Sequence, residues 1–305
     1  MSHTHSHHHH EVNNTNRSFA IGIALNVVFV IIEAGYGLAA DSLALIADAG
    51  HNLSDVMSLM LAWGASYLAT KYPTRKRTYG LRKVTIMASL VSSVLLFVAL
   101  GGIAWESIER LSSPKPVDGV IIIVVAGIGV VINTATALLF VKGQKHDLNL
   151  RAAYLHMAAD AAISLGVVLA GLAIMVTGWL WLDPVISLFI VVVILVSTWD
   201  LLRDSIDLSI DAVPQGIDIQ HIQDYLKGLK DVSDLHDLHV WALSTTETAL
   251  TVHLVSSSDT IDNRFLEEIQ EHLHHHFNIA HTTIQVEKED CDYNCVLDRD
   301  ECKFK

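Results

Sequence analysis

Two His-x3-Asp pairs lie in strongly apolar parts of the chain, where ionisable side chains are costly and usually functional. The first pair is His51 and Asp55, and the second is His156 and Asp160. Residues four apart lie on one face of a helix, roughly 6 Å apart along its axis. Two imidazoles and two carboxylates from two helices can form a tetrahedral site. Such a site suits zinc and is compatible with cobalt, cadmium or nickel.

The same four side chains are candidates for proton coupling. Metal binds deprotonated ligand atoms, so protons compete with it for the site. An alternative is that each pair only forms hydrogen bonds with its neighbours. The presence of two independent pairs with the same spacing makes this purely structural interpretation weaker. Asp48 falls on nearly the same helix face as His51 and Asp55. It fits a proton relay, an entry ligand, or equally a helix-capping or interhelical hydrogen bond.

Six segments are apolar and long enough to cross the hydrocarbon, which needs about 20 residues. They cover residues 18–39, 43–69, 84–108, 117–141, 152–177 and 181–203. We therefore expect an all-α, six-helix membrane bundle over residues 18–207, with antiparallel neighbours joined by short connections. Four further polar residues within these spans are expected to face the bundle interior as packing partners: Asn26, Glu33, Asn133 and Asp200.

Composition supports a lipid bilayer as the environment of this part. The chain of 305 residues is 51% hydrophobic and only 17% charged, whereas soluble domains average about 25% charged. The formal net charge of −13 lies mainly after residue 207. An acidic tail repels nucleic acid and attracts cations, so no nucleic-acid partner is expected.

Lysine and arginine predict the orientation in the membrane. They cluster in the loops after the second and fourth spans, whereas the opposite face carries only Arg110 and Lys115. Because basic residues favour the cytosolic side, both termini and the acidic tail are predicted to be cytosolic.

Residues 208–290 change to the pattern of a small α+β domain. Helices are expected at 218–229 and 262–277, and strands at 234–243, 249–256 and 282–287, in the order α-β-β-α-β. About 80 residues bury only a modest core. An exposed sheet face or edge therefore predicts a homodimer through this domain.

Four stretches resemble the cation diffusion facilitator family, in particular its zinc exporters, over essentially the whole chain: Ser42–Asp55, Arg77–Lys83, His156–Asp160 and His236–Trp241. The resemblance implies a homodimer with a metallochaperone-like cytosolic domain that exchanges Zn²⁺ for H⁺ by alternating access. Broader Zn/Cd/Co efflux stays open. The connection at 142–151 lacks the long His-rich insertion common in eukaryotic relatives, which favours a bacterial inner membrane.

The resemblance also implies metal ligands in the small domain, with Zn²⁺ as a regulatory ligand. Its main candidates are His236, His253 and Glu287, although some members carry histidine where Gln285 stands. Weaker candidates are His239, His281, Cys291 and Cys295. Lys83 matches a lysine that interlocks the third and sixth spans in some relatives. Its partner would be Asp207 or Asp211, and an ordinary lysine of the cytosolic face is the alternative.

Both ends of the chain have compositions of their own. Residues 1–17 form a His-rich arm, expected to be disordered and to collect zinc weakly unless it is a purification tag. Residues 291–305 hold the cysteines, which are either metal ligands or free thiols. Four histidines that end the second tail helix are expected to form a solvated cap, His272, His274, His275 and His276.

The residue pattern also bears on two other functions. An intramembrane zinc hydrolase is not expected, because catalytic zinc keeps an open coordination position and no His-Glu-x-x-His motif occurs. A membrane metal sensor would signal through metal-dependent dimerisation of the tail, yet no recognisable output domain follows. The sequence therefore predicts a transporter and no enzyme.

Overall fold

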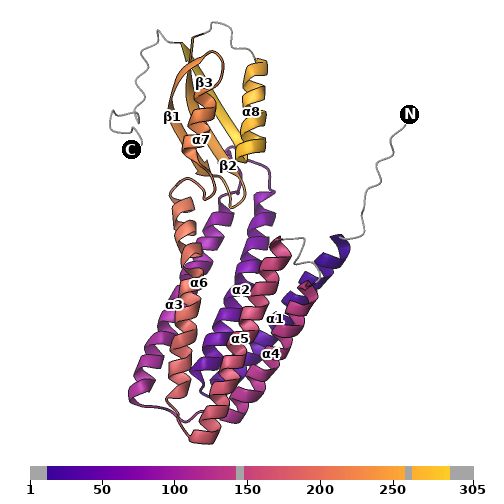
Figure 1. Cartoon of the computed structure of the whole chain (residues 1–305), viewed down its shortest axis with the longest axis vertical. Coiled ribbons are helices and arrows are strands. Elements are labelled where there is room, and N and C mark those ends of the chain that lie inside the picture. The colour runs from indigo at the N-terminus through magenta and orange to yellow at the C-terminus, as the bar shows by residue number, and fades with distance from the viewer. Residues whose placement is uncertain (1–11, 142–147, 258–262, 289–305) are drawn as a thin grey trace, which may run out of the picture. The chain divides into compact units, whose positions relative to one another are not determined.

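The computed structural model describes residues 12–141, 148–257 and 263–288 (Figure 1). It divides into two compact units. The first contains the described residues up to Met60 together with Ser92–Trp199. The second contains Leu61–Val91 and the described residues from Asp200 onward.

Six long helices overlap the six predicted segments: α1 Val12–Ala39, α2 Leu43–Ala69, α3 Val84–Ser112, α4 Gly119–Phe140, α5 Leu148–Thr177 and α6 Leu182–Ser209. Since α1 begins at Val12, residues 12–17 are helical, and the prediction of a disordered arm is wrong for them. Four stretches of α3 to α6 are long and apolar enough to cross a membrane: Val84–Ser112, Gly119–Leu139, Tyr154–Thr177 and Leu182–Ser209. Within the described residues α1 offers a shorter apolar stretch, Asn26–Ala39. In α2, four polar residues lower the hydropathy, namely Asp48, His51, Asn52 and Asp55. The count of six spans therefore stays a prediction.

Helices α4 and α5 are in unusually close contact. A Cβ atom on Gly119 would lie 3.0 Å from the Gly171 carbonyl oxygen, and one on Gly171 would lie 2.8 Å from Ile122. Since glycine has no side chain, the two backbones approach each other here as small residues allow in membrane helices. This approach aligns α4 with the helix that carries His156 and Asp160.

The start of α2 is held by a residue from another helix. Asp183, at the start of α6, accepts hydrogen bonds from the Ser42 hydroxyl and from the backbone N–H groups of Leu43, at 2.8 Å, and Ala44. Asp183 is 1% exposed. These backbone groups have no partner inside α2, so Asp183 acts as an N-cap supplied by a neighbour. The cap fixes the helix that carries His51 and Asp55.

The small domain has the predicted order α-β-β-α-β: α7 Ile219–Lys227, β1 Val232–Ala242, β2 Thr248–Ser256, α8 Asn263–Phe277 and β3 Ile279–Lys288. Its sheet has the order β1-β2-β3, with β1 antiparallel and β3 parallel to β2. The core includes Ile222, Leu226, Leu250, Leu254 and Leu273, all 0% exposed.

The last strand begins three residues earlier than the predicted residue 282. Asn278 has a φ of 56°, in the left-handed region that commonly ends a helix and that asparagine tolerates. One residue therefore joins α8 directly to β3, and the strand starts at Ile279.

Candidate metal centres

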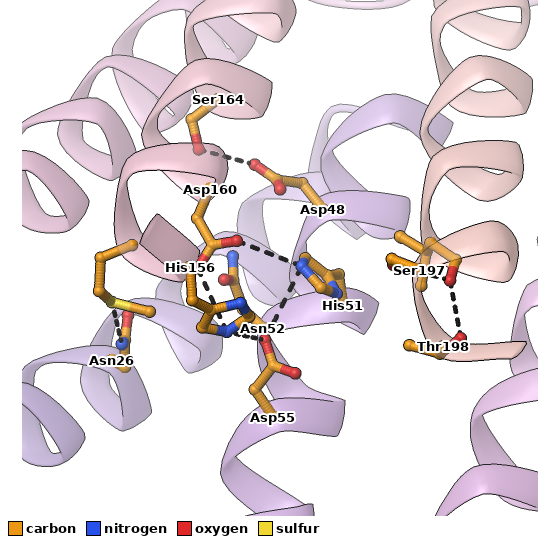
Figure 2. A network of polar contacts seen from close by, with 12 residues as sticks. Asn26, Asp48, His51, Asn52, Asp55, His156, Asp160, Ser164, Ser197 and Thr198 are labelled. Atoms are coloured by element: carbon orange, nitrogen blue, oxygen red, sulfur yellow. Dashed lines mark hydrogen bonds and ion pairs between the residues drawn. The ribbon is translucent and has the colours of Figure 1, made fainter. Parts of the chain in front are cut away.

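The two His-x3-Asp pairs converge in the first unit. His51 and Asp55 of α2 point toward His156 and Asp160 of α5, as Figure 2 shows. Each imidazole Nε2 contacts both carboxylates. His51 Nε2 lies 3.2 Å from Asp160 and 3.8 Å from Asp55, whereas His156 Nε2 lies 3.1 Å from Asp55 and 3.7 Å from Asp160.

The four nitrogen–oxygen distances are near those of a tetrahedral ligand set, and His51, Asp55 and Asp160 hold ligand atoms that all lie within 4.8 Å of one another, a group that does not include His156. Ligand atoms about 2.0–2.1 Å from a tetrahedral zinc lie about 3.3 Å from one another. The four nitrogen–oxygen distances span 3.1–3.8 Å, and the two imidazole rings are 5.9 Å apart at 77°. One divalent cation between the four groups would replace repulsion between the carboxylates with attraction to both.

The four side chains differ in accessibility. The side chains of His51 and Asp160 are 8% and 1% exposed, whereas those of Asp55 and His156 are 34% and 43% exposed. Asp55 lies one turn further along α2 than His51, and His156 lies one turn earlier in α5 than Asp160. The ring of ligands is therefore open at one end and closed at the other.

Further polar residues surround the ring of ligands (Figure 2). Ser164 donates to Asp48 at 3.0 Å, and Asn52 donates to Glu33 at 3.2 Å. The Asn26 amide lies 3.6 Å from the sulfur of Met157. Glu33 is buried, as expected of an interior residue.

Asn133 and Asp200 differ in their environment. Asn133 is buried, and among the described residues neither polar atom of its side chain has a hydrogen-bond partner. Asp200 is exposed, so its predicted interior position is wrong. The buried face of α6 runs through Ile190, Ile194 and Ser205, and Asp200 lies off that stripe.

A second group of metal-ligating side chains lies on the three-stranded sheet. His236 of β1 and His253 of β2 are cross-strand partners, with ring centroids 5.1 Å apart. Glu287 of β3 contacts both, at 3.3 Å from His236 Nε2 and 2.9 Å from His253 Nδ1. Gln285 donates to the Glu287 carboxylate at 2.8 Å. Each of the three strands thus contributes one ligand candidate.

Asp237 joins this group, and sequence reasoning missed it. Its carboxylate accepts from His239 at 2.9 Å and lies 3.6 Å from His253 Nε2. Strict strand alternation puts Asp237 on the face opposite to His236. The strand pairing shifts between His236 and His239, and Asp237 has a φ of 52°. This bulge turns the carboxylate toward the histidines. The position of Asp237 between His236 and His239 in the sequence could have indicated this further ligand candidate.

The remaining predicted ligands lie apart from the three or outside the described residues. His239 reaches the group only through Asp237. The His281 ring packs edge-on against Tyr79, at 5.7 Å. Cys291, Cys295 and residues 1–11 of the predicted arm lie outside the described residues.

The predicted interlock residue has one of its two expected partners. Lys83 donates to Asp211 at 2.6 Å. Asp207 instead lies 3.9 Å from Arg203, one turn earlier in α6. Both side chains of the Lys83–Asp211 pair are about half exposed, at 47% and 55%.

The histidines at the end of α8 do not form a uniform solvated cap. His274, His275 and His276 are exposed in the last turn. His272 stacks on Tyr225 with ring centroids 4.0 Å apart, and on His276 at 4.2 Å. Partial burial and the neighbouring His276 lower the pKa of His272 below its usual range.

Comparison with known proteins gives a consistent result along the chain. The model described as the cation efflux transmembrane domain matches residues 19–208, and that of the cation efflux protein cytoplasmic domain matches residues 214–289. The metal cation efflux system protein CzcD of Cupriavidus metallidurans is 36% identical, over 95% of this chain and 90% of its own. The zinc transporter ZitB of Escherichia coli is 34% identical, over 95% and 93%. The cadmium, cobalt and zinc/H(+)-K(+) antiporter of Bacillus subtilis is 34% identical, over 86% and 85%.

Proposed function

Because the chain belongs to the cation efflux family, also called the cation diffusion facilitators, we propose that it exports zinc from the cytosol in exchange for protons. The family consists of metal cation transporters, not enzymes, and the chain is an integral membrane protein that transports metal cations. Zinc as the main substrate and protons as the counter-ion are the finer parts of the proposal.

One observation carries the proposal, namely the closed ring of alternating imidazoles and carboxylates between α2 and α5. Each histidine nitrogen contacts both carboxylates, at 3.1–3.8 Å. We assign His51, Asp55, His156 and Asp160 as the transport site. Nitrogen and carboxylate ligands without sulfur hold zinc without the tight thiolate bonds of structural sites, which suits release.

Proton coupling follows from the same atoms. When zinc leaves, the two imidazoles and two carboxylates face one another with unpaired lone pairs and excess negative charge. Protons entering from the opposite side neutralise that charge and return the site to a low affinity for metal. His51, Asp55, His156 and Asp160 therefore carry zinc in one direction and protons in the other.

The proposed membrane topology has six spans, α1 to α6, with both termini in the cytosol. The polar residues of α2 lower its mean hydropathy. They are compatible with a membrane span because they face other helices. In this topology, the exposed ligands Asp55 and His156 lie on the cytosolic side of His51 and Asp160. The structure then represents the state that is open to the cytosol. A bacterial inner membrane is the proposed location.

The proposed domain limits follow the sequence. Residues 18–207 form the transport domain and residues 208–290 the cytosolic domain, with the His-rich arm at 1–17 and the Cys-containing tail at 291–305. We assign His236, His253 and Glu287 as a cytosolic zinc site with Asp237 at its edge. The match to the family's cytoplasmic domain supports a homodimer through this part.

The direct test is zinc accumulation in proteoliposomes of the intact protein with an imposed pH gradient. Asp55→Ala and Asp160→Ala are expected to abolish gradient-driven uptake. Asp200→Ala is the matched control, because it removes an exposed carboxylate from α6. Equal uptake by all four proteins would refute the assigned site, and gradient-independent uptake would refute the antiport.

The same vesicles test the breadth of the substrate. Cadmium and cobalt appear with zinc in the name of the Bacillus subtilis relative. Competition of each metal with zinc uptake at equal concentration measures the preference. Stronger inhibition by cadmium or cobalt than by unlabelled zinc would replace zinc export with broader metal efflux.

Regulation by cytosolic zinc is a separate part of the proposal. Zinc at His236, His253 and Glu287 is expected to draw the two small domains of a dimer together. Spin labels on exposed residues of α8 in full-length protein would report their distance with and without zinc. An unchanged distance would refute this regulation and leave the transport proposal intact.

A further inference from the structure

Two carboxyl groups lie buried beside the transport site, and neither forms an ion pair with a lysine or arginine among the residues that the structure describes. Glu33 of α1 and Asp48 of α2 are each 0% exposed. Asp48 precedes His51 by three residues, about 4.5 Å along the helix and away from Asp55. In the proposed topology, this is the non-cytosolic side of the ring, where the ligands are closed off from solvent.

Each carboxyl group has one oxygen satisfied by a neutral donor. The Asn52 amide donates to Glu33 Oε2 at 3.2 Å, and the Ser164 hydroxyl donates to Asp48 Oδ2 at 3.0 Å. The other two oxygens, Glu33 Oε1 and Asp48 Oδ1, are buried and have no donor among the described residues. The two side chains are nevertheless within hydrogen-bonding reach of each other.

Ionised carboxylates only accept hydrogen bonds. Two of them in contact inside a membrane protein repel each other and lose their hydration, a large cost. One proton between Glu33 and Asp48 removes the repulsion and allows a hydrogen bond between the two groups, since the protonated group donates and the ionised one accepts. Among the described residues, the titratable groups that face the pair are His51 and Asp160.

Close packing limits access of water to this place. A Cβ atom on Gly129 of α4 would lie 2.6 Å from the Phe29 ring and 3.1 Å from the Ser164 hydroxyl. Phe29 is itself 0% exposed. The hydroxyl that donates to Asp48 is therefore held by tight contacts between α1, α4 and α5, and water has little room to replace the missing donor.

We propose that Glu33 and Asp48 share one proton and form a protonation site separate from the four transport ligands, on their non-cytosolic side. The pair then carries one negative charge while that side is closed. When the side opens, the O–H bond of the protonated carboxyl breaks and the proton passes to water. Two hydrated carboxylates are left, which attract the outgoing cation, and an external proton restores the pair afterwards. The shared proton does not depend on proton antiport, whereas its role in zinc release rests on the proposed function.

Infrared difference spectroscopy of the full-length, metal-free protein in lipid vesicles tests the shared proton. A protonated carboxylic acid gives a C=O stretching band that shifts in D2O. Glu33→Gln and Asp48→Asn are each expected to remove one such band at neutral pH. Glu109→Gln, an exposed residue of α3, is the matched control and should leave it. Absence of the band in the unmodified protein, or its persistence in both variants, would overturn the proposal.

Zinc transport then tests the role of the pair. Glu33→Gln supplies an amide donor in place of the shared proton, so the fold and zinc binding at the four ligands should persist while gradient-driven turnover falls. The double variant Glu33→Gln, Asp48→Asn should be no slower than the slower single variant, because the two groups act as one unit. If the fold-losses of turnover in the two single variants multiply in the double variant, the two groups act independently, and the proposed shared role would be refuted. If the intact protein failed to transport, the infrared result would still decide whether the proton is shared.

Discussion

The chain contains two groups of histidine and carboxylate ligands that are built in different ways. In the helical unit, two identical pairs from α2 and α5 interleave, and two of their four side chains are almost fully buried. On the sheet, His236, His253 and Glu287 come from three strands, and both histidine side chains stay about one fifth exposed, at 22% and 19%. The first group offers four ligand candidates, three of which, His51, Asp55 and Asp160, have ligand atoms within 4.8 Å of one another. The second offers three, with further carboxylate and imidazole groups at its edge.

On the proposed assignments, this difference separates a site that exchanges its metal through the membrane from a site that only senses it. A helix pair can slide or rotate as a rigid element, so the ring between α2 and α5 can be opened from either end. A site spread over three hydrogen-bonded strands changes little without disrupting the sheet. We therefore expect loss of a helical ligand to stop transport and loss of a sheet ligand to alter only its control.

The largest effect is expected from removing the histidines of the helical site. His51→Ala and His156→Ala each leave three ligands and a vacancy, and even the loss of a residue that only hydrogen-bonds to a metal ligand costs about 10–100-fold in metal affinity. Zinc uptake should fall by at least about 100-fold on this scale. His221→Ala, an exposed histidine of α7, is the control. If His51→Ala and His156→Ala took up zinc as well as His221→Ala, the distinction between a transporting helical site and a sensing sheet site would be lost.

Replacing one imidazole by an oxygen ligand sharpens the comparison further. His51→Asp keeps four ligands but adds a hard carboxylate, which favours manganese relative to zinc. Uptake of manganese relative to zinc should rise by about tenfold or more, the effect of about 1.4 kcal/mol. An unchanged ratio would mean that the histidines do not set the preference.

A smaller effect is expected for the sheet site. Glu287→Gln removes the carboxylate that contacts both His236 and His253. Equilibrium dialysis of the full chain should show fewer zinc ions bound, while uptake at saturating zinc is retained. Glu267→Gln, on the exposed surface of α8, should keep the full number of bound ions. Loss of saturating uptake in Glu287→Gln would show that the sheet site is part of the transport step.

The contact between α4 and α5 predicts a loss of stability that leaves ligand chemistry untouched. A Cβ atom on Gly171 meets Ile122 at 2.8 Å, whereas one on Gly166 of the same helix meets nothing within 4 Å. Gly171→Ala should destabilise the bundle by about 1–3 kcal/mol, and Gly166→Ala should be neutral or gain up to about 1 kcal/mol. Thermal unfolding in detergent compares them. Equal unfolding midpoints for Gly171→Ala and Gly166→Ala would show that α4 and α5 move apart at Gly171 at little cost, which would contradict the prediction.

The smallest effect concerns a surface ion pair of the small domain. Partial burial of Asp234 opposes ionisation, but hydrogen bonds from the Leu235 N–H and Lys227 outweigh it and lower the pKa of Asp234. A lowered pKa stabilises the fold above the unfolded-state value, and this stabilisation is lost as pH falls through the folded value. Because both side chains are mostly exposed, Lys227→Ala should cost at most about 0.5 kcal/mol at neutral pH. Chemical denaturation at neutral and acidic pH should show this difference shrinking in acid, and a growing difference would contradict the assignment.

Local pattern was sufficient for the elements and for the pairs within each helix. Apolar runs of about 20 residues predicted six helices, because side chains in lipid must be apolar and the backbone must bond to itself. The i, i+4 spacing predicted that His51 lies near Asp55. Alternation and turn residues likewise predicted the order of the small domain, with strand ends displaced by a few residues.

Asp200 and Asp237 show where that reasoning fails. Polarity within a span predicted an interior position for Asp200, but its orientation depends on the angle at which α6 meets its neighbours. Asp237 was not among the expected ligands, because strict alternation would put it on the far face of β1, whereas a bulge turns it toward His253. Both cases concern rotation about an element's own axis, which residue types at one position do not encode.

The sequence by itself determined which residue types stand one turn apart, and therefore that two His–Asp pairs exist on two helices. Only the tertiary structure decided that the shortest contacts cross between helices, 3.2 Å from His51 to Asp160 and 3.1 Å from His156 to Asp55, against 3.8 and 3.7 Å within each helix. It also brought Glu33 within reach of Asp48. The reason is that helical spacing is fixed by 3.6 residues per turn, whereas distances between helices follow from how whole surfaces of side chains interlock.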